Sequence, residues 1–125
     1  MSWKADTQTW IGPGISLLAT LPFIPSALMK LFPNAQATEG MAHLGIPVSL
    51  LPTLAVLELS CVVLYAIPAT SILGSILFTG YIGGIISTHL RVREPVYIPI
   101  VLGLLVWLGP WLRELRLRPL LPLRR

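Results

Sequence analysis

A histidine, two arginines and a glutamate gather at the end of one long apolar segment. Residues 79–95 begin as an uncharged, glycine-rich stretch. Its end carries His89, Arg91, Arg93 and Glu94, and Pro95 follows, which is expected to stop a helix. Histidine exchanges protons near neutral pH, and arginine holds anionic or carbonyl groups through charge-assisted hydrogen bonds. The end of this segment is therefore a candidate for chemistry.

Glu58 is the only charged residue between Pro47 and Ser87. A charged side chain at the centre of a membrane costs about 2.5–3.5 kcal/mol, so it must be protonated, paired or hydrated. Lys30 closes the preceding apolar run. Because helical side chains lean toward the start of their own helix, Lys30 and Glu58 lean toward each other if the two runs are antiparallel helices. We expect Lys30 or His89 to pair with Glu58.

Two interpretations of these groups stay open. In one, Glu58, Lys30 and His89 only lock helices together. In the other, Glu58 and His89 form a proton-transfer pair in a polar pocket that opens toward the arginines. The ligand-binding candidates of that pocket are Lys30, Arg91, Arg93, Tyr81 and Ser26. We favour the pocket, because ionisable groups inside a membrane usually serve a function. Tyr81 lies about two turns before His89 and is placed to face the same cavity, but packing is the favoured role for it.

Neither a metal site nor a cysteine redox site is expected. Cys61 is the single cysteine, so the chain has no Cys-x-x-Cys pair, and we expect it to be a buried, inert thiol. His43 is expected in a loop and His89 at a helix end, so the two histidines are not expected to form a metal site. With no nucleotide or haem motif, the sequence specifies no cofactor.

The composition is that of a membrane protein. The 125 residues are 54% hydrophobic and only 11% charged, with a mean hydropathy of +0.79, against about 25% charged residues in soluble domains. The excess positive charge lies in the arginine-rich tail, residues 113–125. A basic tail after the last apolar run is typical of a cytoplasmic chain end, so nucleic acid is not an expected partner.

Four apolar runs predict an all-α membrane protein, an up-down bundle of four transmembrane helices in a single domain, residues 1–125. The runs cover about residues 10–32, 47–67, 69–90 and 95–112. No removable signal peptide is expected, and Trp3 and Trp10 are expected to anchor the first helix at the interface.

Prolines and glycines in these runs predict how the helices bend and pack. Pro22 and Pro25 predict a kink in the first run. A loop of about a dozen residues is expected next, and the very short link at Pro68 makes the second and third runs antiparallel neighbours. Gly80 and Gly84 have the spacing that permits close helix packing or a homo-oligomer.

Four crossings with a cytoplasmic tail place both termini in the cytoplasm. Arg91 and Arg93 then lie on the opposite side, against the usual distribution of positive charge. Either Glu39 and Glu94 neutralise them, or they belong to a site.

Short motifs spread along the chain resemble the DoxX-like family of small bacterial membrane proteins. They are Ser26-Ala-Leu-Met-Lys30-Leu, Leu44-Gly-Ile-Pro47, Leu57-Glu-Leu59, Gly80-Tyr-Ile-Gly-Gly84 and Thr88-His-Leu-Arg91. The resemblance implies a four-helix bundle, location in the bacterial inner membrane and an association with membrane redox chemistry. It matches Lys30, Glu58, His89 and Arg91 to the family pattern.

Three functional hypotheses follow, and the sequence does not decide whether the protein is an enzyme. The first is a polar pocket near the non-cytoplasmic face that binds a small or lipophilic molecule such as a quinone. The second is a non-catalytic subunit that docks a redox partner protein. The third is an acid/base enzyme of the isomerase type that acts on an apolar substrate.

Overall fold

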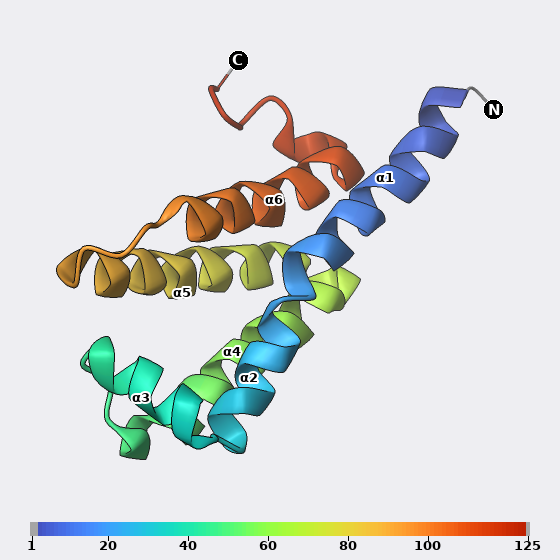
Figure 1. Cartoon of the computed structure of the whole chain (residues 1–125). Helices are drawn as coiled ribbons and strands as arrows, with labels where there is room; N and C mark the ends of the chain where they lie inside the picture. The colour runs from blue at the N-terminus through green and yellow to red at the C-terminus, as the bar shows by residue number, and fades with distance from the viewer. Residues whose placement is uncertain (1–2, 125) are drawn as a thin grey trace.

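The computed structural model describes the backbone of residues 3–124 and the side chains of residues 11–124. Trp3 and Trp10, expected as interfacial anchors, lie outside the described side chains. The described chain is helical and has no β-strand. Its helices are α1 (Trp3–Thr20), α2 (Phe23–Leu31), α3 (Ala35–His43), α4 (Leu51–Ala66), α5 (Ser71–Arg91) and α6 (Tyr97–Arg113) (Figure 1). Three short 3-10 helices are η1 (Val48–Leu50), η2 (Pro68–Thr70) and η3 (Leu115–Leu117).

Three apolar helical segments are long enough to cross a membrane. They are Ile11–Leu31 with 21 residues, Val48–Ala66 with 19 and Pro68–Arg91 with 24. The fourth, α6, is apolar but shorter, with 17 residues. The all-α membrane protein predicted from the sequence is confirmed, with three helical segments of full spanning length and one shorter helix.

The first apolar run is broken at Leu21 and Pro22, where the sequence predicts a kink. Proline has no N–H to donate, and its ring clashes with the carbonyl of the preceding turn. Helix α1 therefore ends at Thr20, and α2 begins at Phe23. The two halves have different neighbours, because α1 packs against α6 while α2 packs against α4 (Figure 1).

Helices α4 and α5 are packed neighbours, as the short link at Pro68 predicts. Their backbones lie close together at Gly74, where a Cβ atom would collide with the backbone of Tyr65. The expectation of close packing at Gly80 and Gly84 is wrong within this chain. A Cβ atom built at either glycine has none of the described neighbours within 4 Å.

The expected loop after the first run is a helix. Asn34 ends the preceding segment in an extended conformation, and its side chain accepts a hydrogen bond of 2.7 Å from the backbone N–H of Ala37. This N-cap starts α3, which carries Glu39 and ends at His43. A left-handed turn at Gly45, with a φ of 81°, then leads the chain toward α4.

Aromatic rings join three of the helices away from the chain ends. The ring of Phe78 lies 4.8 Å from that of Phe23 and 5.4 Å from that of Tyr65, centroid to centroid. The Tyr65 hydroxyl donates to the carbonyl of Val106 at 2.9 Å and lies 3.0 Å from the hydroxyl of Ser16. Contacts of this one side chain therefore connect α4 to α1, α5 and α6.

The chain folds back on itself after α6. The Trp111 indole N–H donates to the carbonyl of Leu121 at 3.0 Å, and the Arg118 guanidinium lies 4.8 Å from the Trp111 ring centroid. The Arg116 side chain donates to both carboxylate oxygens of Glu114, and this pairing lowers the pKa of Glu114 to about 2. The arginine-rich tail is thus held against the end of α6.

Candidate binding site around Glu58

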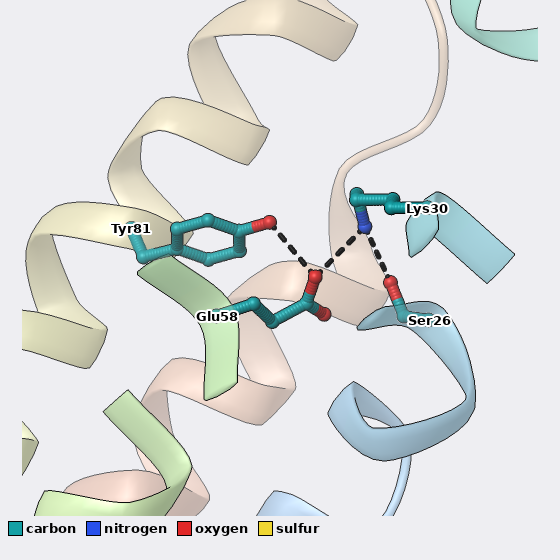
Figure 2. A network of polar contacts seen from close by, with 4 residues as sticks. All are labelled: Ser26, Lys30, Glu58 and Tyr81. Atoms are coloured by element: carbon teal, nitrogen blue, oxygen red, sulfur yellow. Dashed lines mark hydrogen bonds and ion pairs between the residues drawn. The ribbon is translucent and has the colours of Figure 1, made fainter. Parts of the chain in front are cut away.

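Glu58 lies in the middle of α4 and is 1% exposed. Its carboxylate oxygen Oε2 is 2.8 Å from the ammonium nitrogen Nζ of Lys30 (Figure 2). Lys30 lies near the end of α2 and is also buried. The opposite lean of the two side chains predicts this contact. An ion pair in so apolar a setting is weakly screened, and each charge offsets the desolvation of the other.

Two further side chains complete the network. The Tyr81 hydroxyl, on α5, donates to the same oxygen of Glu58 at 3.0 Å, and Lys30 also donates to the hydroxyl oxygen of Ser26 at 2.6 Å (Figure 2). Ser26 and Lys30 are four residues apart and so share one face of α2. The Tyr81 ring packs edge-on against Phe23, with centroids 6.4 Å apart. The network therefore joins α2, α4 and α5.

A cavity of about 450 Å³ adjoins this network, and we call it the first cavity. Its polar lining consists of Ser26, Lys30, Tyr81, Thr88 and His89. Much of the rest is apolar, and Gly80 and Gly84 leave room along α5. Cavities of about 300–1,000 Å³ with a few polar groups in an apolar wall are typical small-molecule sites.

His89 lines the first cavity but does not pair with Glu58. Its Nδ1 atom is 2.8 Å from the carbonyl oxygen of Ile85, one turn earlier in α5. A carbonyl can only accept, so Nδ1 must carry the proton, and in the neutral ring Nε2 is left as an acceptor. No hydrogen bond joins His89 to Glu58 among the described side chains. Their role as a proton-transfer pair remains a prediction.

The two arginines of the candidate site lie apart from the network. Arg91 is exposed and donates to the carbonyl of Leu44 at 2.6 Å, beside the turn at Gly45. Arg93 is exposed, with a φ of 59°, and adopts the left-handed conformation that ends α5. Neither residue lines the first cavity. Their assignment as ligand-binding residues therefore gains no support from the geometry.

Neutralisation by Glu39 and Glu94, one of the two explanations left open for these arginines, finds no ion pair in the described structure. Glu94 lies 3.1 Å from His43 instead, so a contact joins the end of α3 to the segment after α5. The ion pairs among the described side chains do not include Glu39.

Several cavity residues have no charge or hydrogen-bonding chemistry that would single them out in the sequence. Met41 and Leu44 come from α3 and its C-cap, and Ile46 and Leu54 come from the chain that follows. The available signal was Asn34, a helix-starting residue that points to α3 and so to a wall of the cavity. No three His, Cys, Asp or Glu side chains gather in metal-binding geometry within the described part of the chain.

The fold and the motifs agree with a comparison to protein families. A model of the DoxX-like family matches residues 14–109. The chain belongs to the DoxX-like family. The match includes Lys30, Glu58, Tyr81 and His89, and this DoxX-like chain is an integral membrane protein. Comparison with curated proteins and with solved structures finds no match.

Proposed function

We propose that this DoxX-like protein binds a lipophilic molecule with a carbonyl group, such as a quinone, in the first cavity. The observation that carries the proposal is the buried ion pair of Lys30 and Glu58 beside a cavity in an otherwise apolar membrane segment. Burying two charges in an apolar interior costs desolvation energy. Hydrophobic side chains of similar volume often stabilise a fold as well as a buried ion pair, or better. A binding role gives a reason for their presence.

The donors of the network favour a ligand with an acceptor atom. An ammonium group has three N–H donors, and Lys30 uses two of them on Ser26 and Glu58. The third is available to a carbonyl or anionic oxygen. The apolar remainder of the wall suits a ring or an alkyl chain, and the exposed Gly80 and Gly84 give access from the lipid side.

The redox association that the family resemblance implies makes a quinone the ligand class to test first. In this proposal Lys30 holds a quinone oxygen, while Glu58 and His89 supply groups that exchange protons. Tyr81 and Ser26 keep the charged pair in place.

The proposal also includes four crossings, with both termini in the cytoplasm of a bacterial cell. Helix α6 has 17 residues and at 1.5 Å per residue is about 26 Å long, close to the hydrocarbon thickness of about 30 Å. The arginines that follow it favour the cytoplasmic side.

Two adjacent glycines provide a matched test. Gly84 lines the first cavity and Gly83 does not, yet a Cβ atom at either meets none of the described neighbours within 4 Å. We expect Gly84→Leu to weaken binding of a short-chain quinone by about tenfold or more, because leucine fills the cavity. Gly83→Leu should bind like the wild type.

The measurement is a quinone titration of the protein in lipid nanodiscs, corrected for empty nanodiscs, with native mass spectrometry to identify what the protein retains. Wild-type binding no greater than in empty nanodiscs, or equal losses in the two leucine variants, would refute the proposal. The same spectra give the oligomer size of the wild type and of Gly84→Leu, and a difference between them would point to association through the Gly80/Gly84 face.

A further inference from the structure

A second cavity of about 300 Å³ is lined by Glu58, which does not line the first. Most of its wall is apolar and comes from the break between α1 and α2, from α5 and from the start of α6. The residues Phe23, Ile82, Ile98, Pro99 and Leu102 form much of it. Glu58, Ser26 and His89 are its polar members, and Ser26 and His89 line both cavities.

Glu58 has one carboxylate oxygen without a partner. Lys30 and Tyr81 both donate to Oε2, and no described side chain or backbone group donates to Oε1. Figure 2 shows the two dashed lines ending on Oε2 and none on the other oxygen. A carboxylate has about four acceptor positions, so Oε1 can accept further hydrogen bonds. Glu58 as a whole is 1% exposed, so Oε1 has little contact with bulk water, although it is not among the fully buried atoms that lack a hydrogen-bond partner.

The polar wall of the second cavity offers acceptors in excess of donors. Besides the Glu58 carboxylate, the His89 ring offers an acceptor at Nε2 when it is neutral, because Nδ1 donates to Ile85. Ser26 contributes one hydroxyl group. Lys30 and Tyr81, which donate within the network, line the first cavity and not the second.

We propose that the second cavity binds an apolar molecule that carries a hydroxyl group, and that this hydroxyl donates to Oε1 of Glu58. A carbonyl group would face the carboxylate with like partial charge. A free cation would meet an apolar wall with only one carboxylate, whose charge Lys30 already balances. A neutral O–H group satisfies the oxygen and leaves an apolar body for the wall.

The assignment goes beyond the function proposed for the first cavity and does not require it. The two cavities select opposite partners: the first offers an ammonium donor and the second a carboxylate acceptor. Glu58 lines the second cavity, and its oxygen Oε2 accepts from Lys30 and Tyr81, which line the first.

A phenol and its methyl ether test the hydroxyl directly. The probes are 4-butylphenol and 4-butylanisole, which differ in the O–H donor and keep similar apolar bodies. Binding to the full-length protein in nanodiscs is measured by ligand-observed NMR, with partition into empty nanodiscs subtracted. Because a hydrogen bond to a charged group contributes about 1.5–3 kcal/mol, we expect the phenol to bind about tenfold or more tightly than the ether.

Two variants locate the site. Ile98 lines only the second cavity and is 60% exposed, so Ile98→Trp should fill that cavity without disturbing the core and should remove phenol binding. Gly84→Leu, which fills the first cavity, should leave the preference for the phenol intact. Quinone binding in Ile98→Trp reports on the first cavity separately, so the two proposals can fail independently.

A third variant tests the carboxylate. Replacing Lys30 and Glu58 together by methionine removes both charges and leaves no unpaired ion, and this double variant should bind phenol and ether equally. Equal binding of the two probes to the wild type would overturn the proposal, because it would show that the hydroxyl group adds no affinity. A phenol preference that survives Ile98→Trp and disappears in Gly84→Leu would also overturn it.

Discussion

At the scale of single residues, Lys30 and Glu58 hold each other's charge in the membrane. Lys30→Met should lower the free energy of unfolding by about 3–5 kcal/mol, because Glu58 is then left as an unpaired buried charge. Equilibrium unfolding of the variant in detergent, followed by circular dichroism, measures the loss.

The double variant Lys30→Met/Glu58→Met is the control. Without either charge it should be more stable than Lys30→Met alone, because similar-sized hydrophobic side chains replace a buried pair without large loss. A double variant less stable than the single one would mean that the pair stabilises the fold by itself, beyond mutual neutralisation.

The sequence predicted part of the site at this scale. Charge isolation and helix geometry predicted the contact of Lys30 and Glu58. The hydrogen bond from Tyr81 to Glu58 was not predicted, because packing was the favoured role of Tyr81. The positions of Arg91 and Arg93 depend on backbone features that residue types do not reveal. Arg91 finds the free carbonyl of Leu44. Arg93 takes the left-handed position that usually falls to glycine at the end of a helix, where Glu94 N–H then bonds to the His89 carbonyl at 2.9 Å.

At the scale of elements, Gly74 sets the distance between α4 and α5. Gly74→Ala should destabilise the protein by about 1–3 kcal/mol, because the new methyl group collides with the backbone of Tyr65, which cannot rotate away. The thermal unfolding midpoint in detergent is the measurement.

Gly83→Ala is the matched substitution on the same helix. It places a methyl group in open space and gains helix propensity, so its midpoint should equal or exceed that of the wild type. Equal midpoints for the two alanine variants would show that α4 and α5 can separate at Gly74 without loss.

The sequence predicted the apolar helices better than the short polar helix α3. Long apolar runs predicted the spanning segments, and the prolines at 22 and 25 predicted the bend in the first of them. Helix α3 has no apolar run and only nine residues, so hydropathy does not detect it. Its one clear signal is the cap at Asn34. Close packing was expected at Gly80 and Gly84 but occurs at Gly74. The spacing of glycines alone does not say which of them face α4.

At the scale of the whole molecule, the crossing of α6 decides on which side the tail lies. In a Cys61→Ala background, Gly40→Cys on α3 and Leu123→Cys in the tail place single thiols at exposed positions. If all four apolar segments cross, an impermeant maleimide should label Gly40→Cys in intact cells and Leu123→Cys only after the cells are permeabilised.

Labelling of both positions from the same side would show that α6 does not cross. Wild-type protein serves as the blank, because Cys61, its one thiol, is buried. The choice of partners between helices is a property of this scale that hydropathy does not encode. Nothing in the apolar runs indicates that α1 packs on α6 while α2 packs on α4.

The bend at Pro22 also bears on how a nascent chain assembles. Helices leave the ribosome in chain order, so α2 meets its partner as soon as α4 has been made, and Lys30 and Glu58 can neutralise each other at that stage. Helix α1 is synthesised first but cannot pack against its partner until α6, the last α-helix, has been synthesised. Chain order thus lets the charged centre form early and leaves the outer pair of helices to close the molecule.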